Sequence, residues 1–249
     1  MRLGSLAAGI ADQLSLAFRN PKKFIDNIDY TLHPKKLADK LLGLELLPPI
    51  HVHVEPHDSR QPHLNVLLPT LNPTKLTGGP NTALIIACHL AKMHIPIRVV
   101  ALDEQVIANV DVLVAHLTSL SGEQIQPNSI TFGSTCQADR PVAIGHRDVF
   151  LATSWTTAYR LKSVFPRMMT PEFLYLIQDF EPGFYPWSSS YAQALETYSL
   201  PFHALINQQG LADYLFQSSV GQFADPAFKD KCIVFEPAID RTLFFSQKQ

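Results

Sequence analysis

The sequence has few cysteines, no long apolar run and no excess of charge of one sign. Cys88, Cys136 and Cys232 are far apart and form no CxxC pair, which is typical of thiols in a reducing compartment. No apolar run approaches the roughly 20 residues that a membrane-spanning helix needs. The apolar start of the chain is interrupted by Asp12 and Gln13 and lacks a signal-peptide cleavage site. We therefore expect a cytoplasmic protein.

The 249 residues include 20 basic and 22 acidic side chains, so no basic surplus indicates a nucleic-acid partner. Hydrophobic residues make up 46% of the chain and charged residues 17%, which is enough apolar material for a core. No GxGxxG, GxxxxGK[ST], GxSxG or HExxH pattern is present. An unrelated Rossmann-type oxidoreductase, a P-loop protein and the corresponding hydrolases are therefore poorly supported.

Residues 1–62 are predicted to be a helical N-terminal extension that ends in a linker. Apolar residues recur at helical spacing from Leu3 to Phe18, and prolines at positions 21 and 34 begin two further predicted helices. Lysine pairs follow both prolines, so these helices either dock on a membrane surface, form a homodimer contact or pack on their own domain. The linker contains the alternating histidines His51, His53 and His57, which we interpret as solvated rather than as ligands of a metal.

Residues 63–236 alternate short apolar runs with helical stretches. Predicted strands cover Leu64–Leu68, Ile97–Ala101, Val110–Ala115, Asp148–Thr153, Phe173–Gln178, Pro201–Asn207 and Cys232–Phe235. Predicted helices cover Asn81–Met93, Thr156–Val164, Ser189–Tyr198 and Gly210–Phe216. This order predicts an α/β fold, a Rossmann-like parallel sheet with helices on both faces. Ligands of such sheets bind at the carboxyl ends of the strands.

A glycine-rich loop follows the first of these strands. Gly78, Gly79 and Pro80 precede a predicted helix that begins at Asn81, so this segment of four residues, with its backbone N–H groups, is a candidate for binding a donor diphosphate. A flexible connection between strand and helix explains the same residues equally well.

The segment Gln178–Trp187 carries the strongest signal of a functional site. It places two carboxylates, an amide and four aromatic rings, one of them a tyrosine, in ten residues after a predicted strand. Aromatic faces and carboxylates suit a saccharide, so Gln178, Phe184, Tyr185 and Trp187 are candidate acceptor-binding residues. The alternative is a loop whose aromatic rings only anchor it to the core.

Ser154 and Trp155 stand at another strand end and are further candidates for binding the acceptor. A helix N-cap explains Ser154 equally well.

Four stretches together resemble the WsaF-type bacterial rhamnosyltransferases, which belong to the large fourth family of glycosyltransferases and have the GT-B fold. They are LNVLLPTLNPTKLTGGPNTAL, DVFLATSWTTAY, YLIQDFEPGFYPWSSSYAQALETY and FEPAIDRTLFF. The resemblance covers roughly residues 64–245, and QDFEPGFYPW is its most specific part.

The resemblance implies an acceptor-side domain facing a second, donor-binding domain, with no metal or other cofactor required. The pattern from Pro237 to Phe244 resembles the family's crossing into that second domain, so residues 237–249 are expected to begin a crossing to a domain that the chain lacks. The implied co-substrate is a nucleotide-sugar such as dTDP-rhamnose, and the partner is a saccharide or glycan acceptor. Asp179 and Glu181 are the candidate catalytic carboxylates, orienting the acceptor hydroxyl or accepting its proton. The alternative is a non-catalytic saccharide-binding or scaffolding module.

Overall fold

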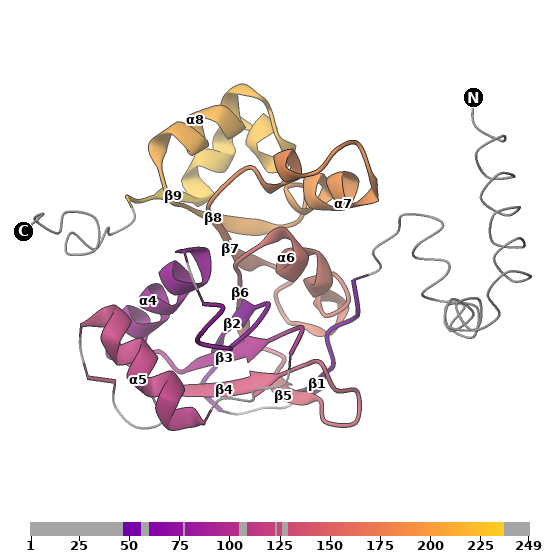
Figure 1. Ribbon diagram of the computed structural model, residues 1–249. Helices are drawn as coiled ribbons and strands as arrows, with labels where there is room; N and C mark the ends of the chain where they lie inside the picture. Colours follow the sequence, from indigo (N-terminus) through magenta and orange to yellow (C-terminus); the bar gives the residue numbers. More distant parts are fainter. Residues whose placement is uncertain are drawn as a thin grey trace, which may run out of the picture. The chain divides into compact units, whose positions relative to one another are not determined.

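The computed structural model describes residues 47–55, 60–76, 78–104, 109–122, 124–125 and 129–236. The helices predicted within residues 1–46 and the pattern from Pro237 to Phe244 lie outside these residues. The described part is built on a seven-stranded, all-parallel sheet in the order β4-β3-β2-β6-β7-β8-β9 (Figure 1). The strands are β2 (Leu64–Leu68), β3 (Ile97–Ala101), β4 (Ile130–Ser134), β6 (Val149–Ala152), β7 (Phe173–Ile177), β8 (Phe202–Ile206) and β9 (Cys232–Val234).

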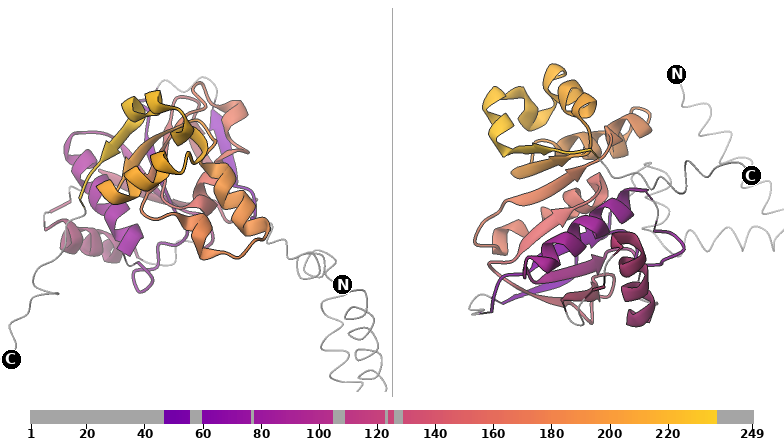
Figure 2. Two further views of the ribbon diagram at one scale, coloured as in Figure 1. Left: turned by 90° about the horizontal axis from the view of Figure 1, so that it is seen from above. Right: turned by 90° about the vertical axis from the view of Figure 1, so that its left-hand side faces the viewer.

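Helices connect the successive strands of this sheet except β4 and β6. The α-helices are α4 (Gly78–Lys92), α5 (Val110–Ser121), α6 (Trp155–Leu161), α7 (Ser189–Thr197) and α8 (Gln209–Gln217). Short 3₁₀ helices are η1 (Phe165–Arg167), η2 (Glu181–Phe184), η3 (Gly221–Ala224) and η4 (Pro226–Lys231). The right-hand view of Figure 2 looks onto the face of the sheet that α4 and α5 cover.

Two apolar clusters fill the two faces of the sheet, because successive side chains of a strand point to opposite sides. In β2, Val66 and Leu68 belong to the cluster that also contains Leu84 of α4. Leu67, the residue between them, belongs to the cluster that contains Leu161 of α6 and Leu215 of α8. All five residues of β2 are buried, as expected for a central parallel strand covered on both sides. The predicted α/β fold, a Rossmann-like parallel sheet with helices on both faces, is thus confirmed.

One predicted strand is wrong. Residues Val110–Ala115 begin α5 instead, where the Asn109 side chain caps the helix by accepting a hydrogen bond from the Asp111 backbone N–H (3.2 Å). Leu113 and Leu117 are the buried residues of α5, and their spacing of four is that of one helical face. The apolar composition of this run favours a strand, but the N-cap at Asn109 begins a helix there.

Three strands lie outside the predicted set: β4, which pairs with β3 at the edge of the seven-stranded sheet, and two that form a separate pair. The interpretation of residues 47–62 as a linker differs from the structure, in which β1 (Val52–Glu55) pairs in parallel with β5 (Val142–Gly145). Ile50, just before β1, is buried in the same cluster as Leu67, and Val52 and Val54 pack against that cluster. The alternation of valines with polar residues is the signal of a strand with one face against a core.

Candidate functional site

The carboxyl edge of the sheet has a topological switch point between β2 and β6. The chain runs from β2 through β3 to β4 on one side, and from β6 through β7 to β9 on the other. Loops diverge at such a point and leave a crevice outside the strand ends, where ligands of open α/β sheets bind. Thr153 joins the two sides, because its hydroxyl donates a hydrogen bond to the Leu67 backbone oxygen (2.7 Å). The loops after β2 and β6 therefore flank the same crevice.

The two predicted glycines lie in the first turn of α4, so the helix begins three residues earlier than predicted. Gly78 has a φ of +42°, a backbone conformation that residues with a side chain rarely adopt. A Cβ atom at Gly79 would lie only 2.6 Å from Nε2 of Gln178. The glycine-rich segment and the aromatic loop after β7 are thus in contact, although they are distant in sequence.

The other two residues of the glycine-rich segment have structural positions in the same helix. Pro80 is in the first turn of α4, where the missing N–H of proline costs no helical hydrogen bond. The Asn81 side-chain oxygen is 3.2 Å from Nε2 of His116 on α5. Of this segment, the backbone of Gly78 and Gly79 is therefore the part best suited to a ligand.

Ser154 makes a helix cap rather than an open binding group. Its hydroxyl accepts a hydrogen bond from the Thr157 backbone N–H (3.4 Å), and the Thr157 hydroxyl accepts one from the Ser154 N–H (3.1 Å). This reciprocal capping box begins α6 and satisfies two backbone donors at the carboxyl edge. The cap is thus present, and it accounts for the serine at this position.

Trp155, a candidate acceptor-binding residue, is buried in the structure at 4% exposure. Its indole N–H donates a hydrogen bond to the Tyr185 hydroxyl (3.0 Å), and the two rings pack edge to face with centroids 5.7 Å apart. Its backbone N–H donates a hydrogen bond to the Glu181 carboxylate. Trp155 therefore fixes the Gln178–Trp187 loop at two points.

Glu181 is the most perturbed acid of the candidate site. The pKa of its carboxyl is raised from 4.5 to about 7. Burial is the main cause, the hydrogen bond from Trp155 partly opposes it, and the negative charge of Asp179 adds to it. A carboxyl with this pKa exchanges its proton near neutral pH, which is the property required of a general acid or base.

The remaining residues of the loop divide into anchors and exposed groups. The Phe180 ring packs edge to face against Tyr214 (5.3 Å between centroids), and the Tyr198 hydroxyl donates to the Asp179 backbone oxygen (3.2 Å). The Asp179 side chain is exposed, although its Oδ1 accepts a hydrogen bond from the Phe180 N–H (2.7 Å). Phe184 is 63% exposed and Trp187 92%. The structure therefore agrees with both interpretations of this loop, a binding site and an anchored connection. Some of its aromatic rings pack against the core, and others are exposed to solvent.

Two residues near the site were not predicted. Arg160 of α6 is buried and donates to an Asp103 carboxylate oxygen (2.6 Å) and to the Pro48 backbone oxygen (2.8 Å). It thereby joins α6 to the end of β3 and to the segment before β1. The signal available was a basic residue among the small and apolar residues of a helix. The other is Tyr191 of α7, whose ring stacks on Trp187 (5.1 Å between centroids, 27° between planes).

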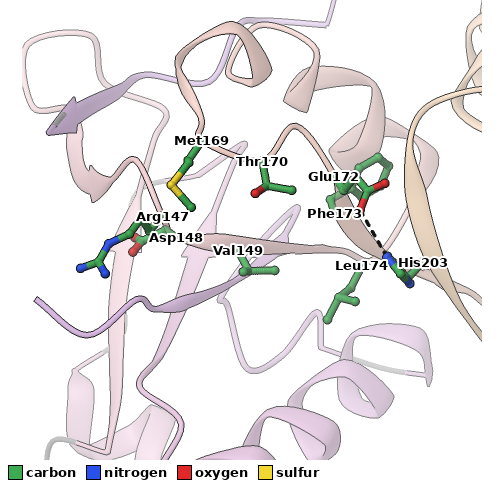
Figure 3. Close-up of a pocket in the computed structure, with 9 residues that line it drawn as sticks. All are labelled: Arg147, Asp148, Val149, Met169, Thr170, Glu172, Phe173, Leu174 and His203. Atoms are coloured by element: carbon green, nitrogen blue, oxygen red, sulfur yellow. Dashed lines mark hydrogen bonds and ion pairs between the residues drawn. The ribbon is translucent and has the colours of Figure 1, made fainter. Parts of the chain in front are cut away.

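A pocket of about 220 Å³ lies at the opposite, amino edge of the sheet (Figure 3). Val149 and Phe173, which begin β6 and β7, are among its lining residues. Its acids are engaged in structural contacts: Asp148 accepts hydrogen bonds from the His63 N–H and the Asn65 amide, and Glu172 pairs with Lys231 (2.9 Å) and His203 (3.4 Å). Its complete lining is Arg147, Asp148, Val149, Met169, Thr170, Glu172, Phe173, Leu174 and His203. None of the predicted site residues lies there.

Two properties of the described residues bear on metals and membranes. Nowhere in the part of the chain that the structure describes do three or more His, Cys, Asp or Glu side chains gather as a metal ion would require. His53 lies in β1, whereas His57 is outside the described residues. Among the helices described, none has the length and apolar character needed to cross a membrane.

Sequence comparison places residues 63–208 in the family described as "WsaF, N-terminal domain", which confirms the resemblance noted from the motifs. The chain is also 36% identical, over 102 residues, to the O-antigen biosynthesis protein RfbC of Myxococcus xanthus. That alignment covers 41% of this chain and 7% of the relative, so the chain matches only a small part of that protein.

Proposed function

The chain belongs to the family of WsaF N-terminal domains, and from this we propose that it is the acceptor-side half of a glycosyltransferase with the GT-B fold that acts in the synthesis of a cell-surface glycan. The proposed reaction transfers a sugar, rhamnose from dTDP-rhamnose, to a saccharide acceptor. The observation that carries the proposal is the position of Glu181. This carboxyl, whose pKa is about 7, lies in an aromatic loop at the carboxyl edge of a Rossmann-like sheet.

Glycosyl transfer requires the acceptor hydroxyl to be oriented and to lose its proton. We assign to Glu181 the role of accepting this proton, because a base is most effective when its pKa is close to the working pH. Its hydrogen bond from the Trp155 backbone leaves the carboxylate held in one place. Asp179, which is exposed two residues earlier, is assigned the orientation of the acceptor and raises the pKa of Glu181 by its charge.

The leaving nucleotide diphosphate carries negative charge that the protein has to stabilise. The first turn of α4 offers backbone N–H groups and the positive end of a 15-residue helix. No acidic side chain stands in that turn, and Gly78 leaves open space, because no atom lies within 4 Å of the position that a Cβ atom would take there. We assign this turn to the donor diphosphate, with the nucleotide itself bound by a second domain of the enzyme.

The test is transfer of labelled rhamnose from dTDP-rhamnose to surface-glycan precursors by the full natural protein. The Glu181→Gln variant is expected to lose about 10²- to 10⁴-fold in transfer rate at pH 7, the usual contribution of a general acid or base. The matched control is Glu172→Gln, which removes a carboxylate at the amino edge and is expected to leave the rate unchanged. Equal rates for wild type and Glu181→Gln would remove Glu181 from the reaction.

A non-catalytic saccharide-binding module is the second candidate. The exposed rings of Phe184 and Trp187 favour it, since they provide binding surface that needs no reactive group. The two functions separate in the same assay, because the module binds glycan precursors but never releases nucleotide from the donor.

A further inference from the structure

Trp187 is the most exposed large apolar side chain of the described residues, at 92%. Exposed single hydrophobic residues are common, but tryptophan is large, and leaving it in water forgoes considerable burial energy. Its ring is also held in place. It stacks on Tyr191 of α7 with centroids 5.1 Å apart and planes 27° from parallel. One face of the indole is thus supported while the ring as a whole remains accessible.

The support under Trp187 is itself fixed to the core. Farther along the chain from Tyr191, Ala194 and Thr197 of α7 and the adjacent Tyr198 are buried. The Thr197 hydroxyl is 3.2 Å from that of Tyr175 in β7, and the Tyr175 and Tyr198 rings pack with centroids 5.9 Å apart. Trp187 therefore rests on a helix whose far end is anchored in the sheet, so little ordering remains to be done when a ligand stacks on it.

From this geometry we propose that Trp187 and Tyr191 form an aromatic platform for a second sugar unit of the acceptor, so that the enzyme acts on an oligosaccharide rather than on a monosaccharide. The proposal rests on the proposed function and extends it to the length of the substrate. Glu181 is half-buried, whereas Trp187 is almost fully exposed. A sugar stacked on Trp187 therefore lies nearer to the solvent than the Glu181 carboxylate does. It is not the unit whose hydroxyl reacts.

The chemistry of the surrounding chain favours a neutral saccharide over other ligands. From Gln178 to Tyr191 the sequence contains two acids, Asp179 and Glu181, and no lysine or arginine. Acidic surroundings repel nucleic acid and anionic lipid, both of which are bound through basic residues. One stacked pair of rings is also much smaller than the roughly 800 Å² that each partner contributes to a stable protein interface. The flat apolar face of a pyranose matches a single indole ring.

The platform lies next to the predicted reaction centre along the chain. Tyr185 is two residues before Trp187, so their Cα atoms are at most about 7 Å apart. Tyr185 contacts Trp155, and the Trp155 backbone N–H holds Glu181. Neighbouring sugar units of one chain are thus the ligands that would occupy both places together.

The test compares glycans of different length by calorimetry and tryptophan fluorescence on the intact chain. The probes are methyl glycosides and the corresponding di- and tetrasaccharides of rhamnose, glucose, galactose and mannose. In wild type we expect the tetrasaccharide of the preferred sugar to bind at least tenfold more tightly than its methyl glycoside. The chain has two tryptophans, and Trp155 is buried, so a fluorescence change on binding reports mainly Trp187.

Three variants make the test specific. Trp187→Ala and Tyr191→Ala are expected to abolish the tenfold preference for length. Tyr191→Phe keeps the supporting ring and should retain the preference. Met169→Ala, which truncates an exposed apolar side chain lining the amino-edge pocket, is the control and should behave as wild type.

The outcomes separate this inference from the proposed function. Equal affinities of wild type for short and long glycans, or an unchanged preference in Trp187→Ala, would overturn the platform while leaving an acceptor site intact. Absence of binding by every probe would overturn both the platform and the acceptor-side function.

Discussion

The Glu181 carboxylate accepts a hydrogen bond from the backbone N–H of Trp155, the first residue of α6. This contact joins the loops after β6 and β7 at the carboxyl edge of the sheet. Because Trp155 also donates its indole N–H to Tyr185, a single buried residue positions both a carboxylate and an aromatic ring of the candidate site.

The pH dependence of stability should reveal the perturbed carboxyl. Its folded-state pKa of about 7 is above the ordinary value of 4.5, so between these values the folded protein binds more protons than the unfolded chain. Stability is therefore expected to fall as pH rises from about 4.5 to 7, by at most about 3 kcal/mol, and then to level off. Urea unfolding of wild type and Glu181→Gln at pH 5 and pH 8 measures this, and the variant should lose less stability between the two. The same loss in both proteins would show that Glu181 titrates normally.

Tyr185→Phe should destabilise the protein although it changes one atom. The indole N–H of Trp155 loses its acceptor, and leaving a buried donor unsatisfied costs about 1–3 kcal/mol. Chemical denaturation provides the measurement. Tyr214→Phe, at a tyrosine that is 44% exposed, is the control and should change the free energy of unfolding by no more than about 0.5 kcal/mol. An equal effect of the two substitutions would rule out the Trp155–Tyr185 hydrogen bond as a stabilising contact.

The two glycines of α4 should respond to alanine for different reasons. Gly78→Ala places a side chain at a φ of +42° with free space around it, so it should cost about 1–2 kcal/mol from backbone strain alone. Gly79→Ala brings a methyl group against the flexible end of Gln178, which can move, so its cost should disappear in the Gln178→Ala background. A double-mutant cycle on unfolding free energies measures the coupling. Additive costs at positions 79 and 178 would argue against their contact.

Gly221 is expected to be the least replaceable glycine described. A Cβ atom there would lie 2.2 Å from the Tyr198 backbone oxygen, and its φ is +52°. Backbone cannot move aside as a side chain can, so Gly221→Ala should cost more than about 3 kcal/mol. Gly210→Ala, in the first turn of α8 with open space around it, should be neutral or stabilising by up to about 1 kcal/mol. Thermal unfolding of the pair tests the prediction, and a mild effect at position 221 would contradict the packing around Tyr198.

The central strands were predictable because local and tertiary preferences agree there. Leu64–Leu68 and Ile97–Ala101 have the same bounds in the structure as in the prediction, since both are short, mostly apolar segments in strands covered on both faces. The prediction was wrong where the local composition suits a strand and a helix equally well. The apolar run at Val110–Ala115 suits a strand by composition, and only its N-cap and its buried face make it a helix. β1 resembles a linker by composition, because His53 and Glu55 are polar and the flanking residues include histidines and prolines.

The sequence by itself determined the fold class, the family and the loop Gln178–Trp187 as the place to look for a site, because these depend on periodicity and on motifs within short stretches. Tertiary structure alone decided what identical residue types do within that site. Of two tryptophans, Trp155 is buried as an anchor and Trp187 is open to solvent. Of two acids, Asp179 is exposed, whereas burial raises the pKa of Glu181 to about 7. Burial and long-range contacts such as Gly79 with Gln178 depend on segments distant in the chain, and no local pattern encodes them.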